Sequence, residues 1–160
     1  MSVQDKASVY LRSKVFSASP EELRLMLLDG ALRFARQGRE GLATKNYELS
    51  FNGLSSCKNI LLELVTSMKV EVAPELCAKL RALYMFMYSR LIDANLEKSP
   101  EIVDEVVQLL EYERETWVLL MQRLEAERAS GISQETATPI PVGAAAKPAP
   151  AGRTPLSIEG

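Results

Sequence analysis

The sequence predicts an all-α protein: an antiparallel up-and-down four-helix bundle with a short N-terminal helical cap segment and a disordered C-terminal tail. Four long segments repeat apolar residues at spacings of three and four, which is the periodicity of an amphipathic helix. No stretch alternates with period two for long enough to form a strand. A length of 160 residues suits one domain with a tail, and short connections between long helices favour antiparallel neighbours.

The first bundle helix has a strong start signal in residues 19–22, Ser-Pro-Glu-Glu. Serine is a good N-cap, proline fits the first helical position, and the second glutamate can complete a capping box. The apolar stripe continues to about residue 40. Gly30 inside this helix costs roughly 1 kcal/mol relative to alanine, so we expect it to permit close packing against a neighbour. We expect Gly38 and Gly41 to lead into a turn.

Three further helices follow in the predicted bundle. The second covers about residues 45–68, the third is opened by Pro74 and covers about 75–96, and the fourth starts at the Ser-Pro-Glu of residues 99–101 and stops at Gly131. The side chains expected in the core rather than in a site are Leu61, Leu80, Leu110 and Trp117.

The domain organisation predicted from these patterns has three parts. Residues 1–18 form the cap segment, whose helical stretch at about 5–14 is too short to be stable alone and must dock on the bundle or stay mobile. Residues 19–131 form the bundle. Residues 132–160 hold five of the eight prolines and few large apolar groups, so we predict a disordered tail.

The composition argues against an enzyme. The chain has no histidine, the commonest general base and a common metal ligand, and only two cysteines, Cys57 and Cys77. Glu111, Glu113 and Glu115 lie at alternate positions of a helix, so they point in different directions and cannot converge on one substrate. We therefore expect no cofactor, no metal and no small-molecule substrate.

Other classes are disfavoured by charge and hydropathy. A formal net charge of −2 with mixed signs lacks the basic stripe of a nucleic-acid binder. No apolar run reaches about 18 residues, so no membrane span is expected. The N-terminus lacks the apolar core of a secretory signal, and free thiols fit a reducing compartment, so we expect a cytoplasmic protein.

Excess apolar surface favours a binding module. Residues 83–88, Leu-Tyr-Met-Phe-Met-Tyr, cover every face of a helix, whereas a bundle helix normally buries one stripe. Either the N-terminal segment covers this surface, or the tyrosine hydroxyls stay at the solvent edge, or a partner helix docks there. Arg90 and Arg114 beside the apolar stripes are boundary residues paired with Asp93 or Glu111, or they receive a partner's carboxylate; the sequence leaves both options open.

Several motifs occur together along the chain. Tyr10 is followed by Val-Phe-Ser-Ala-Ser-Pro-Glu-Glu-Leu at residues 15–23 and by Met-Leu-Leu-Asp-Gly-Ala-Leu-Arg-Phe at residues 26–34. In the third helix Leu-Tyr at residues 83–84 begins a further motif, and Glu-Thr-Trp follows at residues 115–117. Over about residues 8–125, in order and with the expected spacing, these motifs resemble the FliS family of flagellar export chaperones.

The resemblance implies a cytosolic chaperone that binds the C-terminal segment of flagellin, prevents premature polymerisation and hands the subunit to the flagellar type III export gate. It also implies that the N-terminal segment can occupy part of the client surface. On this basis we expect a cap from the first segment and a client groove from the second and third helices. The expected client-binding residues are Tyr10, Val15, Ile60, Leu64, Met68, Tyr84, Met87, Tyr88 and Leu91.

Two other interpretations remain open at this point. The same grooves suit a helical adaptor that binds an amphipathic segment of another secreted or regulatory client. A structural bundle that self-associates through its apolar faces is the third interpretation.

Overall fold

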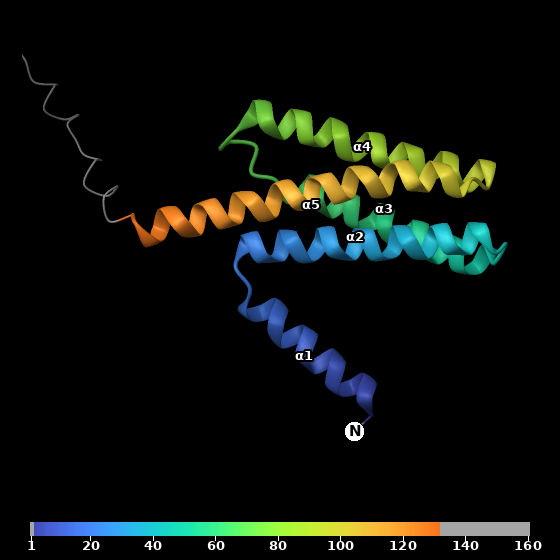
Figure 1. The fold of residues 1–160 in the computed structure, drawn as a ribbon, viewed down its shortest axis with the longest axis horizontal. Coiled ribbons are helices and arrows are strands. Elements are labelled where there is room, and N and C mark those ends of the chain that lie inside the picture. Colours follow the sequence, from blue (N-terminus) through green and yellow to red (C-terminus); the bar gives the residue numbers. More distant parts are fainter. Residues whose placement is uncertain (1, 132–160) are drawn as a thin grey trace, which may run out of the picture. The chain divides into compact units, whose positions relative to one another are not determined.

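A computed structural model describes residues 2–131, and within that range the chain is helical without any strand. The helices are α1 (Val3–Ser17), α2 (Pro20–Ala43), α3 (Tyr47–Thr66), α4 (Pro74–Glu97) and α5 (Pro100–Ala129). Successive helices from α2 to α5 run in opposite directions (Figure 1). The predicted all-α bundle is therefore confirmed, with its helix bounds shifted by only a few residues. The predicted tail, residues 132–160, lies outside the described residues.

The helix starts follow the sequence signals. Ser19 Oγ accepts a hydrogen bond from the Glu22 N–H at 3.1 Å, and the Glu22 carboxylate accepts one from the Ser19 N–H at 3.1 Å, which completes the predicted capping box of α2. At α5, Ser99 Oγ accepts a hydrogen bond from the Ile102 N–H at 3.3 Å. Both Ser-Pro-Glu sequences therefore begin a helix by satisfying backbone donors that the helix cannot pair itself.

The helices reverse direction in short connections. Lys45, between α2 and α3, has a φ of 59°, and Lys98, between α4 and α5, has a φ of 53°. A left-handed residue directly after a helix turns the chain out of the helical path while pairing the last carbonyls. After α4, the N–H groups of Lys98 and Ser99 both donate to the Ala94 carbonyl. The chain can then return alongside the helix that it has left.

Glycines bring α2 and α3 into close contact. Gly38 and Gly41 lie inside the last part of α2 and are buried, and the turn that they were predicted to lead into follows at residues 44–45. A Cβ atom on Gly41 would lie 2.3 Å from the Ser50 backbone nitrogen, and one on Gly53 would lie 2.5 Å from the Gly38 nitrogen. A Cβ on Gly30 would lie 3.2 Å from Ile60 Cδ1, which confirms the expected close packing there.

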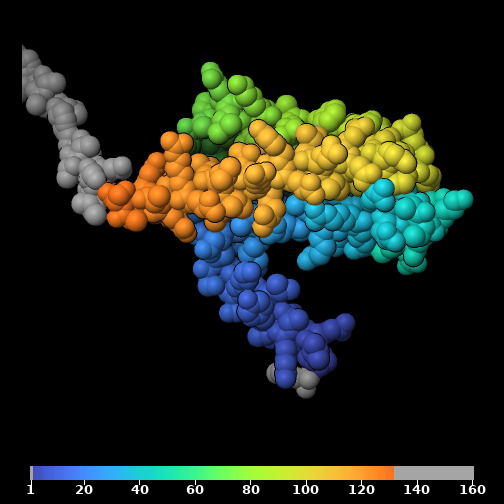
Figure 2. Space-filling model, in the orientation of Figure 1, coloured from blue at the N-terminus to red at the C-terminus, as the bar shows by residue number. Residues whose placement is uncertain are grey.

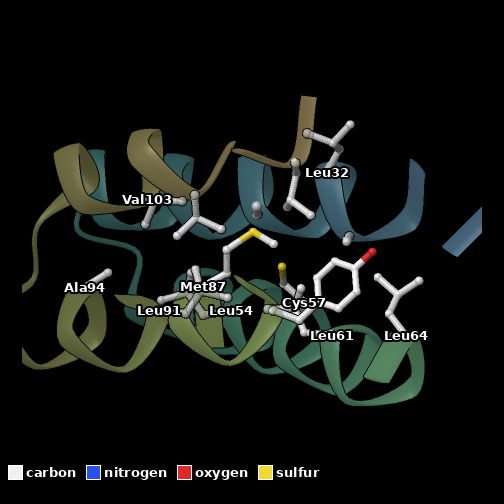
Figure 3. Packing of buried hydrophobic residues seen from close by; sticks show 14 of the residues in the cluster. Leu32, Leu54, Cys57, Leu61, Leu64, Met87, Leu91, Ala94 and Val103 are labelled. Atoms are coloured by element: carbon white, nitrogen blue, oxygen red, sulfur yellow. The ribbon is translucent and has the colours of Figure 1, made fainter. Parts of the chain in front are cut away.

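The buried core fills the space between the bundle helices (Figure 3). Leu61 and Leu110 are almost completely buried, as predicted, whereas Leu80 and Trp117 are partly buried against the core. The largest fully buried side chains are Tyr84, Leu28, Leu54, Leu61, Leu64, Met87, Leu91 and Leu110.

The chain divides into two compact units. Residues 2–119 hold α1 to α4 and most of α5, and the described part of the second unit, residues 120–131, holds the end of α5. Among residues 2–131, no helix combines the length and apolar character that a membrane crossing needs. The candidate site described next lies entirely in the first unit.

Candidate functional site

Helix α1 carries the predicted cap residues on an exposed surface. Its start is closed by Ser2 and Asp5, whose side chains and backbone N–H groups pair reciprocally at 3.2 Å. No residue of α1 is buried. Tyr10 is 65% exposed and Val15 44% exposed, and Phe16 next to Val15 is 83% exposed. Both predicted cap residues are therefore accessible to another protein segment, while their role as a cap stays a prediction.

The seven predicted groove residues divide into two groups. Leu64 of α3 and three residues of α4, Tyr84, Met87 and Leu91, are fully buried. Figure 3 shows Leu64, Met87 and Leu91 among the core side chains between the helices. The other three are partly exposed and pack against the core from its edge: Ile60, Met68 and Tyr88.

The edge residues are positioned by different neighbours. Ile60 Cδ1 lies over Gly30 of α2, at the position where that glycine leaves room. The ammonium group of Lys58, in α3, lies 5.7 Å from the centre of the Tyr88 ring of α4. Ile60 therefore borders α2, whereas Tyr88 borders α3. Of the groove residues, only Ile60, Met68 and Tyr88 can meet a partner without a rearrangement of the core.

Tyr84 is the centre of a polar network inside the bundle. Its hydroxyl accepts a hydrogen bond from Arg24 at 2.7 Å and donates one to Glu113 at 2.9 Å. The guanidinium of Arg24 also lies 5.6 Å from the Tyr84 ring centre and 5.4 Å from that of Trp117. The Trp117 Nε1–H donates to the Glu21 carbonyl at 2.9 Å. The network ties α2, α4 and α5 together.

Burial keeps the Tyr84 hydroxyl protonated. Desolvation raises the pKa of Tyr84 well above its ordinary value, the positive charge of Arg24 opposes this, and Glu113 reinforces it. The protonated hydroxyl can donate to the Glu113 carboxylate while it accepts from Arg24. This arrangement satisfies a buried polar group and is structural in character.

Sequence reasoning missed Arg24 and Glu113. Glu113 was interpreted as part of a solvated face with Glu111 and Glu115, but its side chain pairs with Tyr84. The expectation that the three glutamates do not converge agrees with the structure, since Glu111 pairs with Arg36 instead. In the sequence, Arg24 is notable only as a charged residue between two leucines, Leu23 and Leu25. Nothing in that pattern indicates that its partner, Tyr84, lies 60 residues further along the chain.

Two ion pairs cross a shallow groove between α2 and α5. Arg114 pairs with Asp29, and Arg36 pairs with Glu111 at 2.6 Å. All four side chains are about half exposed, so each pair stabilises the fold by less than about 1 kcal/mol. The groove is lined by Asp29, Leu32, Arg33, Arg36, Glu111, Arg114, Glu115, Val118 and Leu119.

Arg90 is paired within the bundle. It contacts Asp93 at 3.0 Å, as one of the sequence alternatives expected, and forms a two-point interaction with Glu105 of α5. These carboxylates raise the pKa of Arg90. Arg90 and Arg114 therefore both have intramolecular partners. All the charged groups of these pairs are partly exposed.

The feature of the described residues that bears most directly on function is their exposed apolar surface. No cluster of three or more potential metal ligands occurs among residues 2–131. Burial raises the pKa of the Cys57 thiol to about 12, which keeps it in its unreactive form. The exposed apolar residues of α1 and the partly covered edge of the core are features of helical proteins that bind other protein segments.

Comparison with known proteins identifies the family. The family described as "Flagellar protein FliS" matches residues 3–124. The flagellar secretion chaperone FliS of Bacillus subtilis is 30% identical over 128 residues, which cover 80% of this chain and 92% of that protein. The FliS chaperone of Salmonella typhimurium is 34% identical over 112 residues, 69% of this chain and 83% of its own length. That of Escherichia coli is 33% identical over 115 residues, with 71% and 85% covered.

The chain belongs to the FliS family of flagellar secretion chaperones. The resemblance seen in residues 8–125 is thus confirmed, and the match extends over α1 as well as the bundle. The names of the relatives describe chaperones, a role that requires binding and no catalysis.

Proposed function

We propose that this protein is a cytosolic export chaperone that binds the C-terminal segment of flagellin. It would prevent premature polymerisation and deliver the subunit to the flagellar type III export gate. The observation that carries this proposal is the family match over residues 3–124, which includes the bundle and the exposed α1. The apolar surfaces of α1 and of the core edge support it, because a chaperone for an unfolded segment needs accessible apolar groups.

The predicted site residues would have different roles, according to whether each side chain is exposed or buried. Ile60, Met68 and Tyr88 are accessible at the core edge and would contact the client directly. The fully buried residues Leu64, Tyr84, Met87 and Leu91 would pack in the core behind these contact residues and hold them in position. Tyr10 and Val15 are exposed on α1, which buries none of its residues, and they would contact the client directly as a cap over the bound segment.

A disordered client imposes an energetic requirement on this site. Ordering such a segment consumes about 2–5 kcal/mol of the gross interaction energy, so useful affinity requires contacts spread over a large surface. Separate patches on α1 and on the core edge suit an extended client better than a single compact pocket would. We therefore expect several moderate contributions from individual side chains.

The test is calorimetric titration of the full chain with the C-terminal segment of the host's flagellin, about 40 residues, at two or more temperatures. Saturable 1:1 binding with a negative heat-capacity change is expected, because apolar surface is buried as the client folds. Tyr88→Ala and Tyr10→Ala should each weaken binding about tenfold, the effect of losing one aromatic contact. Tyr112→Ala is the matched control, since Tyr112 is a 69% exposed tyrosine of α5 outside the proposed site.

Each outcome assigns the function differently. Weaker binding in the two site variants with an unchanged circular-dichroism spectrum would support the site as proposed. Equal loss in Tyr112→Ala would indicate a different client surface. Absence of binding at tens of micromolar, a range in which even weak specific complexes form, would contradict the flagellin assignment and favour a helical adaptor with another client.

A further inference from the structure

Helix α4 has two apolar faces, and the bundle uses only one of them. The inner face buries Cys77, Tyr84, Met87, Leu91 and Ala94. On the opposite side a second row of residues is exposed at spacings that alternate between four and three. These residues, called here the outer seam, are Ala78, Ala82, Met85, Ser89, Ile92 and Leu96.

The outer seam has the pattern of a coiled-coil interface. Alternation of three and four is the heptad spacing that keeps one row of side chains facing a partner helix. Met85 is 40% exposed, Ile92 38% and Leu96 74%, so the larger side chains of the row are accessible. Helix α4 lies along an edge of the bundle, where another helix can approach it (Figures 1 and 2).

We propose that the outer seam pairs with the same seam of a second copy, in an antiparallel dimer with two-fold symmetry. The order of side-chain sizes along the seam carries this proposal. In an antiparallel pair, the two-fold axis passes midway between Met85 and Ser89, which is the middle of the seam. Ala78 then lies opposite Leu96 of the other copy. The same symmetry places Ala82 opposite Ile92, and Ser89 opposite Met85. Every layer then joins one small side chain to one large side chain, which fills the interface evenly.

A parallel pair fits this seam poorly. It would place Ala78 beside Ala78 and Leu96 beside Leu96, so one end of the interface would be underfilled and the other crowded. Residues of like size would meet in every layer, and cavities and overpacking both destabilise an interface. The direction of pairing therefore follows from the seam itself.

Charges beside the seam favour the same direction. Lys79 and Arg81 flank its first half, and Asp93 flanks its second half. In the antiparallel arrangement Lys79 faces Asp93 of the other copy, twice by symmetry. Asp93 already pairs with Arg90, but its side chain is 42% exposed and a carboxylate can accept from two cations. A parallel pair would bring the basic halves together.

The flanking aromatic residue also fits the two-fold axis. Phe86, 50% exposed, lies beside the centre of the seam, where it would meet Phe86 of the other copy.

The seam offers one helix face per copy, so the buried area belongs at the small end of specific interfaces. We therefore expect a weak dimer that forms reversibly at micromolar concentrations or above. This inference does not depend on the identity of the client.

Sedimentation velocity of the full chain, from about 5 to 500 µM, tests the proposal across the range of weak interfaces. The weight-average mass should rise with concentration toward that of a dimer. Ile92→Lys, which places a charge in the seam, should raise the dissociation constant at least tenfold. Lys79→Glu, outside the packed layers, should weaken the dimer less. Phe51→Lys is the control, because Phe51 is an exposed apolar residue of α3, 59% accessible, that lies outside the seam.

The outcomes separate this face from any other. A chain that stays monomeric throughout, or a dimer weakened by Phe51→Lys and unaffected by Ile92→Lys, would overturn the proposal. Circular dichroism of each variant verifies that the bundle is folded.

Oxidative crosslinking tests the direction. The double variant Met85→Cys/Ser89→Cys should form disulfide-linked dimers, because these positions face each other across the two-fold axis. Ala78→Cys should not crosslink above the wild-type background from Cys57 and Cys77, which are buried. Efficient crosslinking through Ala78→Cys alone would indicate a parallel pair and contradict the model of the dimer.

Discussion

Helices α1 and α2 both begin with a capping box, but only α2 becomes part of the buried core. In α1 the capping box is formed by Ser2 and Asp5, and in α2 by Ser19 and Glu22. Helix α1 has 15 residues and buries none of them, whereas α2 has 24 residues and buries seven. A well-formed start therefore does not determine whether a helix becomes part of the core.

The difference lies in what each helix presents to its neighbours. Helix α2 has small residues where α3 approaches, so that its backbone and that of α3 meet at Gly38 and Gly53. Helix α1 has large apolar side chains without such a counterpart, and it depends on local hydrogen bonds that are marginal for a helix of this length. Capping sets where a helix starts, and complementary packing sets whether it is held.

The largest effect should come from removing a core side chain next to α2. Leu54 is 2% exposed, and Leu54→Ala should lower the free energy of unfolding by about 2–5 kcal/mol, through lost burial and the cavity left behind. Phe16→Ala in α1 removes a larger side chain that is 83% exposed and should change stability by less than about 0.5 kcal/mol. Urea denaturation followed by circular dichroism measures both. Similar losses would mean that α1 is docked in solution.

A smaller but more specific effect is expected at the close contact of α2 and α3. Alanine normally stabilises a helix relative to glycine by about 1 kcal/mol. In Gly53→Ala the new methyl group would meet the backbone of α2 at 2.5 Å, so we expect a net loss of about 1–3 kcal/mol.

Gly30→Ala is the matched control for that contact. Its methyl group would meet only the end of the Ile60 side chain at 3.2 Å, which can move. Its stability should stay within about 1 kcal/mol of the wild type, since the helix gain and the small adjustment offset each other. A stabilised Gly53→Ala in urea denaturation would show that α2 and α3 are farther apart than described.

The polar network tests how firmly α2 is connected to α4 and α5. Tyr84→Phe keeps the ring in the core but removes the hydroxyl that joins Arg24 to Glu113. We expect a loss of about 1–2 kcal/mol in the free energy of unfolding, because two polar groups lose their shared partner. Tyr112→Phe, which removes an exposed hydroxyl from α5, should have no measurable effect. Equal stability of the two variants would show that water replaces the network without cost.

The smallest difference should separate the two caps. Ser19→Ala should lower the free energy of global unfolding by about 1 kcal/mol, because α2 is part of the cooperative bundle. Ser2→Ala removes the equivalent cap from α1 and should leave global unfolding unchanged while reducing the helical signal slightly. A shift of the global midpoint by Ser2→Ala would mean that α1 unfolds together with the bundle.

The helices could be predicted from sequence because their signals are local. Ser-Pro-Glu at residues 19–21 and 99–101 marks helix starts through contacts within one turn, and the structure begins α2 and α5 at those prolines. Periodicity within a single segment likewise identified Leu61 and Leu110 as core. These properties depend on neighbours along the chain, which a sequence displays directly.

The site was less predictable because it depends on distances between helices. Periodicity did not show which apolar residues lie under the surface, so Leu64, Met87 and Leu91 were grouped with the more exposed Tyr88. The close contact at Gly41 could not be predicted for a similar reason. A glycine near the end of an apolar stripe is compatible with a following turn and with a close helix contact, and only the position of Ser50 reveals the contact.

The backbone contact between α2 and α3 also bears on the order of folding. These helices are adjacent in sequence and joined by a short turn, so their pairing closes only a small loop. We expect the α2–α3 hairpin to form early and to give α4 and α5 a surface on which to dock. In native-state hydrogen exchange, amides around Gly38 and Gly53 should then exchange only through global unfolding. Faster exchange there than in α4 would reverse this order and make the outer helices the starting point of the fold.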